Sequence, residues 1–148
     1  GLDIAVTKGD KINLLLCQAS AYSKLKKFDR AEEIFEMALA LNPYNPAVLN
    51  NYAFSLAERK VNLDKADTLI NLALKLEPRS PFYLDTKAWV LYGKKEYEQA
   101  LKILNKCMAI APESTEYYKH AKEIFETMGN QTMANEMQIK IDELNEKK

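Results

Sequence analysis

The sequence predicts an all-α protein in which about four helical hairpins of similar length stack side by side. A proline recurs at nearly constant spacing, at Pro43, Pro78 and Pro112. A small residue keeps the same period, at Ala31, Ala66, Ala100 and Ala134. Two independent markers with separations of 34 and 35 residues indicate repeated helix-turn-helix units, because such periods are typical of stacked supersecondary structures.

Length and charge allow such a stack and exclude several function classes. The chain has 148 residues, 47% of them hydrophobic, and 21 Lys and Arg balance 21 Asp and Glu. Because these charges cancel, the chain has no net electrostatic field that would attract nucleic acid or an anionic membrane, so we expect neither as a partner. No apolar run approaches the roughly 20 residues that span a bilayer, which predicts a soluble chain without membrane insertion. The chain starts at Gly1 without a signal-like segment, and the compartment stays open between cytoplasm and, for an exported protein, periplasm.

The pattern divides the chain into a leader, a repeat domain and a tail. Residues 1–10 are interpreted as a leader or the remnant of a preceding repeat, residues 11–146 as the repeat domain and residues 147–148 as a frayed tail. The four units span about 12–45, 46–80, 81–114 and 115–146. The first helix is expected to begin at Asp10 and the second at Asp29, whose carboxylate would form a capping box with Glu32.

The links between units carry the signals that end one helix and begin the next. Each link contains a proline, which cannot continue a helix but loses nothing in the first turn of the following one. A polar residue in each link is predicted to cap the next helix, namely Asn45, Ser80 and Ser114. The lone 35-residue spacing is attributed to an inner turn at Arg59–Leu63 that is one residue longer than its counterparts.

Small and large apolar residues alternate along the predicted helices as stacked helices require. The recurrent alanines let helix backbones approach closely, while residues such as Tyr22, Leu56 and Leu91 form a stripe that faces the core. The two cysteines, Cys17 and Cys107, lie in helical segments and are predicted to be buried free thiols.

These spacings resemble the tetratricopeptide repeat family. The first unit matches at Leu15, Ala19, Tyr22, Ala31, Phe35, Ala38 and Pro43. The second matches at Leu49, Ala53, Leu56, Ala66, Ile70, Ala73 and Pro78, and the third at Leu84, Ala88, Leu91, Ala100, Leu104, Cys107 and Pro112. The fourth unit departs from the family, because Lys122 replaces a small residue and no closing proline follows, which suits a C-terminal capping unit. The resemblance implies a right-handed superhelix of antiparallel helix pairs whose first helices line a concave groove for a peptide or partner segment.

Carried over from the family, the groove positions fall on the first helix of each unit. They are Asn13, Leu16, Ser20, Lys24, Asn50, Asn51, Phe54, Glu58, Phe82, Asp85, Trp89, Tyr92, Lys119, His120 and Glu123. Some family members hold the carboxylate of a chaperone C-terminus with two lysines, two asparagines and an arginine in these slots. Only Asn51 matches that set here, and the other slots hold Leu16, Ser20, Phe82 and Thr86. A carboxylate-clamp function is therefore not expected.

Aromatic and amide side chains give the predicted groove its chemistry. Asn50 and Asn51 can hydrogen-bond the backbone of a bound segment, and the aromatic residues can anchor its apolar side chains. Two interpretations of Trp89 remain: its side chain anchors a bound segment in the groove, or it packs against the neighbouring unit. The expected partner is a protein or peptide, and self-association is a further option.

No catalytic residue, metal site or cofactor is predicted. His120 is the single histidine, and the sequence contains no HxxxH or CxxC spacing that would bind a metal. It also contains no glycine-rich phosphate-binding loop. The expected function is a noncatalytic protein-interaction module. The alternative is RNA binding by helical-hairpin repeats of the pentatricopeptide kind, which have a similar length, although the neutral charge and the alanine and proline markers argue against it.

Overall fold

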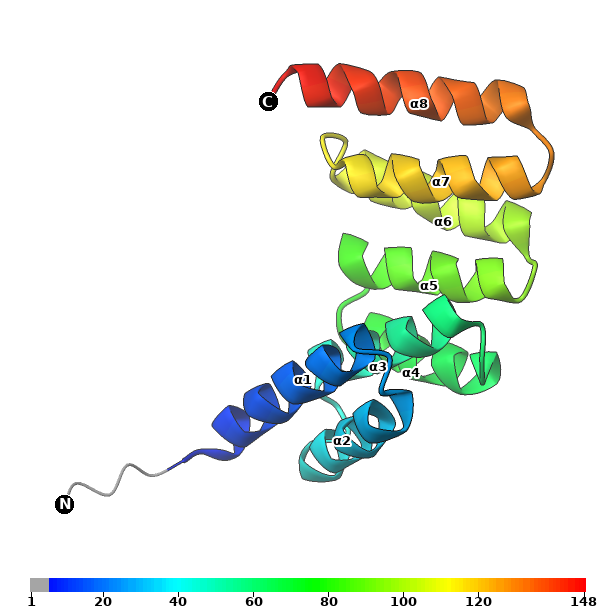
Figure 1. The fold of residues 1–148 in the computed structure, drawn as a ribbon. Helices are drawn as coiled ribbons and strands as arrows, with labels where there is room; N and C mark the ends of the chain where they lie inside the picture. Colours follow the sequence, from blue (N-terminus) through cyan, green and yellow to red (C-terminus); the bar gives the residue numbers. More distant parts are fainter. Residues whose placement is uncertain (1–5) are drawn as a thin grey trace.

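The computed structural model describes residues 6–148, and over that range it contains eight α-helices and no strand (Figure 1). The helices are α1 (Lys8–Lys24), α2 (Phe28–Leu41), α3 (Pro46–Arg59), α4 (Leu63–Leu76), α5 (Pro81–Gly93), α6 (Tyr97–Ile110), α7 (Thr115–Thr127) and α8 (Gln131–Glu146). Consecutive helices pair into four antiparallel hairpins. None of the described helices is long and apolar enough to cross a membrane.

The hairpins pack in chain order and place the first and last helices, α1 and α8, at opposite ends of the stack (Figure 1). Helix α5 lies against α3 and α4 of the preceding unit as well as against its own partner α6. Packing between units is looser where α2 meets α3. This architecture is the predicted all-α, right-handed superhelical solenoid of about four units.

The recurrent alanines are fully buried, as their predicted steric role requires. Leu56 and Leu91 are also buried, and Tyr22 packs against the same core as Leu56. Burying a Leu or Phe side chain contributes about 1.5–3 kcal/mol, and neighbouring units share these residues. Stability is therefore a sum over adjacent units instead of the property of one central core.

Capping at the links follows the prediction at two of three positions. The Asn45 side chain accepts a hydrogen bond from the Val48 amide at 3.2 Å, and the Ser80 hydroxyl accepts one from Tyr83 at 3.4 Å. Ser114 occupies the capping position of α7 but makes no side-chain capping hydrogen bond.

The first helix begins earlier than predicted. The Thr7 hydroxyl accepts from the Asp10 amide at 3.0 Å, and the Asp10 carboxylate accepts from the Thr7 amide at 3.1 Å. This capping box starts α1 at Lys8, so three residues of the predicted leader form its first turn. The leader's residues 1–5 lie outside the described range.

The capping box predicted for the second helix is wrong. Helix α2 begins at Phe28, and its N-cap residue Lys27 makes no side-chain capping bond. Asp29 lies inside the first turn, where its negative charge interacts favourably with the positive end of the helix dipole.

Each hairpin has an inner turn of three residues between its helix ends, at 25–27, 60–62, 94–96 and 128–130. Each turn contains a residue at positive φ, namely Lys26, Lys60, Lys95 and Gly129. Two residues follow Lys60 before α4 begins, whereas one residue follows each of its three counterparts before the second helix begins. The second of these two residues, Asn62, is also at positive φ, so the extra residue lies within the Arg59–Leu63 turn, as predicted.

The two thiols lie in different environments. Cys107 is buried as predicted, and its Sγ donates to the Pro81 carbonyl at 3.4 Å. The prediction for Cys17 is wrong, because this thiol is exposed on α1, the first helix of the stack.

Candidate functional site

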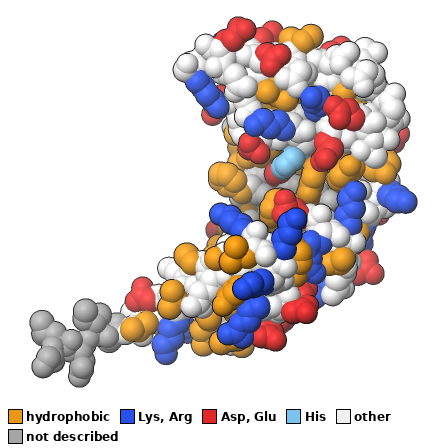
Figure 2. Space-filling model, in the orientation of Figure 1, with side chains coloured by type: hydrophobic (Ala, Val, Ile, Leu, Met, Phe, Trp, Pro, Cys, Tyr) orange, Lys and Arg blue, Asp and Glu red, His pale blue; other side chains and the backbone are white. Residues whose placement is uncertain are grey.

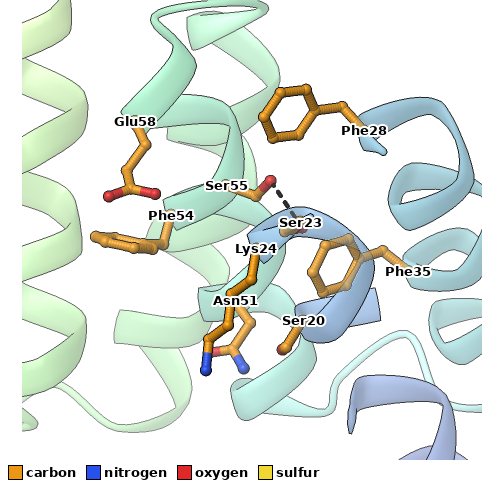
Figure 3. A pocket seen from close by; sticks show the side chains of 9 residues that line it. All are labelled: Ser20, Ser23, Lys24, Phe28, Phe35, Asn51, Phe54, Ser55 and Glu58. Carbon is orange, nitrogen blue, oxygen red and sulfur yellow. Dashed lines mark hydrogen bonds between the residues drawn. The ribbon is translucent and has the colours of Figure 1, made fainter. Parts of the chain in front are cut away.

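Helices α1 and α3 bring five of the predicted groove residues around one pocket, which we call the α1–α3 pocket (Figure 3). Its volume is about 520 Å³. The predicted residues that line it are Ser20, Lys24, Asn51, Phe54 and Glu58. Residues that lie 34 or 35 positions apart in sequence thus meet at one place because successive first helices stand side by side.

The pocket combines aromatic walls with polar groups (Figure 3). Phe28 and Phe54 supply half-buried ring surface from α2 and α3. The Ser23 and Ser55 hydroxyls lie 3.3 Å apart and join α1 to α3. Pockets of this kind hold an apolar group on the ring surface and orient it through the polar groups.

Sequence reasoning missed four lining residues: Ser23, Phe28, Phe35 and Ser55. Phe35 was expected only in the core, and its ring does stack on Tyr52 with centroids 4.9 Å apart. Phe28 had a usable signal, because large apolar residues recur at the same place in the next two second helices, at Leu63 and Tyr97.

Adjacent asparagines on α3 leave one hydrogen-bonding atom free. The Asn50 side-chain amide donates to Asn51 Oδ1 at 3.2 Å. Asn50 Oδ1 is buried and has no hydrogen-bond partner among the described residues. Buried polar atoms are normally paired, so this oxygen is an exception, but it is closed to solvent and Asn50 does not line the α1–α3 pocket.

Further along the stack, Asp85 of α5 contacts His120 of α7, with Oδ1 and Nδ1 2.7 Å apart. The His120 ring also lies against Trp89, with ring centroids 4.3 Å apart. Burial disfavours the imidazolium, but the hydrogen bond and charge of Asp85, with help from Glu116 and Glu123, outweigh it and raise the pKa of His120. Figure 2 shows this single histidine, in pale blue, near the middle of the visible face.

The three aromatic groove residues of α5 differ in accessibility. Phe82 is 71% exposed at the start of the helix. Trp89 is half-buried and packs against both apolar cores as well as Tyr92, with centroids 4.9 Å apart, which favours the packing interpretation. Tyr92 is only 8% exposed and its hydroxyl lies 2.8 Å from Thr127 Oγ1, so it presents little ring to a partner.

The remaining predicted groove residues lie apart from the α1–α3 pocket. Lys119, His120 and Glu123 line a second pocket of about 470 Å³ at α7 and α8, where most lining residues are charged. Asn13 is exposed and Leu16 packs against the core, and neither lines these two pockets.

The side chains along these helices can supply hydrogen bonds, apolar contacts and paired charges. Burial, together with the nearby Asp85 charge, raises the pKa of Cys107 to about 12, which keeps this thiol protonated. Within residues 6–148, no group of three His, Cys, Asp or Glu side chains lies close enough to hold a metal ion.

A stack of helical hairpins with a pocket between successive first helices defines a helical repeat protein of the binding type. Models of the tetratricopeptide repeat match residues 12–55 and 83–114, together just over half of the chain. The chain belongs to the tetratricopeptide repeat family.

Solved structures of other repeat proteins share this fold. MamA 41-end from Desulfovibrio magneticus RS-1 superposes with a TM-score of 0.77 at 18% identity, over 93% of this chain and 77% of that one. MamA of MSR-1 gives a TM-score of 0.71 at 20% identity, over 92% and 78%. The first repeat domain of Spaghetti (RPAP3), bound to the HSP90 peptide SRMEEVD, gives 0.70 at 20% identity, over 87% and 99%. At these identities the likeness shows the fold alone, and no curated protein sequence matches the chain.

Proposed function

We propose that this chain is a noncatalytic interaction module that binds a peptide or a segment of a partner protein in a groove along α1, α3, α5 and α7. The observation that carries the proposal is the α1–α3 pocket, which gathers five residues from the positions that the family uses for binding. Tetratricopeptide repeat domains generally act in this way, and the RPAP3 neighbour is itself bound to a peptide.

The pocket chemistry supports an uncharged anchor on the bound segment. Phe54 offers ring surface to an apolar side chain, while the side chain of Asn51 can hydrogen-bond backbone groups of the bound segment. Lys24 and Glu58 line the same pocket with opposite charges, so the pocket has no net preference for an acid or a base.

We further propose that the groove is not a carboxylate clamp. A clamp needs several basic side chains to converge on one carboxylate. Here Lys24 is the single basic residue that lines the α1–α3 pocket, and Leu16, Ser20 and Phe82 occupy positions that the clamp fills with polar or basic groups.

A displayed peptide library tests the proposal. Peptides selected on the wild-type chain should bind an Asn51→Ala, Phe54→Ala double variant at least about tenfold more weakly, which corresponds to about 1.4 kcal/mol. An Asn71→Ala, Met37→Ala variant is the matched control, because both side chains are exposed on second helices. It should bind as the wild type does.

Two results would count against this function. The first is a failure to select any peptide that distinguishes the double variant from its control. The second is binding of a single-stranded RNA oligonucleotide that weakens steeply with salt, which would favour the pentatricopeptide-like alternative.

A further inference from the structure

The α1–α3 pocket has a counterpart two repeats later, between α5 and α7, where aromatic side chains of the chain itself take up the space. A shift of 69 residues carries the residues that line the pocket onto that junction. Ser20 and Ser23 of α1 then fall on Trp89 and Tyr92 of α5. The two serines therefore leave room at a place where the later unit has aromatic rings.

The contacts of Tyr92 show what this place in the repeat can hold. Its ring lies against Trp89, with ring centroids 4.9 Å apart, and against Tyr97, with centroids 5.8 Å apart. Its hydroxyl lies 2.8 Å from Thr127 Oγ1. Tyr97 and Thr127 are the counterparts of two residues that line the α1–α3 pocket, Phe28 and Glu58. A phenol ring with a hydrogen-bonded hydroxyl thus fits at this position of the stack.

Two phenylalanine rings of α2 give the α1–α3 pocket aromatic walls that are already held in position. The guanidinium of Arg59 lies over the Phe28 ring, 4.3 Å from its centroid. The Phe35 ring stacks on Tyr52, with centroids 4.9 Å apart. Because aromatic rings attract each other beyond the apolar area that they bury, such walls favour an aromatic anchor over an aliphatic one.

A pair of serine hydroxyls lies between these walls and the ring of Phe54 (Figure 3). Within residues 6–148, the 3.3 Å contact between Ser23 Oγ and Ser55 Oγ is the single side-chain hydrogen bond of either residue. One hydroxyl donates in this contact, so the proton of the other and lone pairs on both can pair with a bound group. The corresponding residues at the later junctions are Ala57 with Val90 and Tyr92 with Ile124. The serine pair is therefore specific to the α1–α3 pocket.

Tyrosine combines the two properties that the pocket favours in an anchor. Its ring can lie against Phe28 and Phe54, and its hydroxyl is at the tip of the side chain, which points inward when the residue enters from the groove. There it can both donate to and accept from the serine hydroxyls. Phenylalanine would cover these hydroxyls without pairing with them, which weakens binding.

We propose that the side chain anchored in the α1–α3 pocket is a tyrosine of the bound segment, an inference that rests on the function proposed above. The tyrosine ring takes the place that Tyr92 takes between α5 and α7. Its hydroxyl forms a hydrogen bond with the pair of Ser23 and Ser55.

Peptide selection followed by a double-mutant cycle tests this assignment. Peptides selected on the wild-type chain should share a tyrosine, and its replacement by phenylalanine should weaken binding about fivefold, as expected for one hydrogen bond. A Ser23→Ala, Ser55→Ala variant should bind the tyrosine and phenylalanine peptides equally. Thr68→Ala removes an exposed hydroxyl from α4 and is the matched control, which should keep the fivefold preference.

A Ser23→Tyr variant places a ring in the pocket from within the chain, as Tyr92 does at its own junction. It should bind the tyrosine peptide at least about tenfold more weakly than the wild type does. A cooperative urea transition followed by circular dichroism checks that the variant is folded. The double-mutant cycle decides the question if the larger side chain prevents folding.

Three results would overturn the proposal. The wild type could bind the tyrosine and phenylalanine peptides equally, the preference could persist in the Ser23→Ala, Ser55→Ala variant, or a folded Ser23→Tyr variant could bind as the wild type does. Selected peptides that depend on Asn51 and Phe54 but share no tyrosine would overturn this inference and leave the proposed function standing. A failure to select any peptide that depends on these two residues would count against both.

Discussion

The N-terminal and C-terminal halves of the predicted groove use the same repeat positions in different ways. In the N-terminal half, Ser20, Asn51 and Phe54 surround an open pocket. In the C-terminal half, Asp85 and His120 contact each other at 2.7 Å and the histidine ring lies against Trp89. One half keeps its side chains available for a partner, while the other uses them to join neighbouring units.

The difference depends on which residue the next unit supplies. Asn50 stands 35 positions before Asp85, and Thr86 stands 34 positions before His120, so the Asn50–Thr86 pair is the counterpart of Asp85–His120. Thr86 donates to the Phe82 carbonyl of its own helix at 3.2 Å. It is therefore engaged within α5, which accounts for the unpaired oxygen of Asn50 in the N-terminal half.

The largest expected effect is that of Trp89→Ala, which should lower the free energy of unfolding by about 2–4 kcal/mol. Trp89 packs against both apolar cores, and truncating a buried aromatic residue of this size costs about 3–5 kcal/mol, less here because the ring is half-buried. Urea denaturation followed by circular dichroism measures it. Phe54→Ala is the control in the other half and should cost less, because its ring lines an open pocket. Equal losses in the two variants would remove the distinction between the halves.

The second-largest effect tests whether the helices pack against each other in the same way in the two halves, although the groove side chains differ. Ala66→Leu and Ala100→Leu should each cost about 1–3 kcal/mol, because both alanines are fully buried between helices and a larger side chain would force them apart. The same denaturation measurement applies, with Ala40→Leu at an exposed position of α2 as the control. A stabilised variant at either buried site would mean that the helices there have room to spare.

The fold could be predicted from the sequence because its signals are local and repeated. A buried alanine and a link proline impose the same steric condition in each unit, so their period fixes the hairpins. The Thr7–Asp10 capping box was missed and a capping box was wrongly expected at Asp29, since the cap of a single helix gains nothing from the period.

The candidate site could be predicted only in part, because the repeat gives positions but not pairings. It places Asp85, Trp89 and His120 along the predicted groove, yet their contacts depend on side-chain directions across two units. Tyr92 is a second residue whose contacts the repeat position does not predict. The repeat position indicates a groove aromatic, but the Thr127 hydroxyl and the surrounding core bury it.

A smaller effect should appear as a pH dependence confined to the C-terminal half. The Asp85 contact raises the pKa of His120 in the folded state above its ordinary value of 6.5. The pair therefore stabilises the fold fully below that ordinary pKa, and the contribution is lost as the pH rises through the folded-state pKa. Urea unfolding at about pH 5.5 and about pH 8.5 should show the wild type losing stability at the higher pH.

His120→Gln separates this contact from other titrating groups, because glutamine can still reach Asp85 but carries no charge. The loss of stability between the two pH values should be smaller in this variant than in the wild type. An NMR titration of the single histidine checks the sign directly, and an imidazole that titrates below 6.5 in the folded chain would contradict the assignment.

The smallest expected effect on stability is that of Phe82→Ala, at about 0.5 kcal/mol or less, because the side chain is 71% exposed at the start of α5. This residue lies in the half whose other aromatics are packed, so it is the C-terminal position most available to a bound segment. If the segment extends beyond the α1–α3 pocket, Phe82→Ala should weaken binding of selected peptides while the unfolding curve stays unchanged. Isothermal titration calorimetry beside urea denaturation measures both. Unchanged affinity would confine the binding surface to the N-terminal half and leave the C-terminal half a purely structural role.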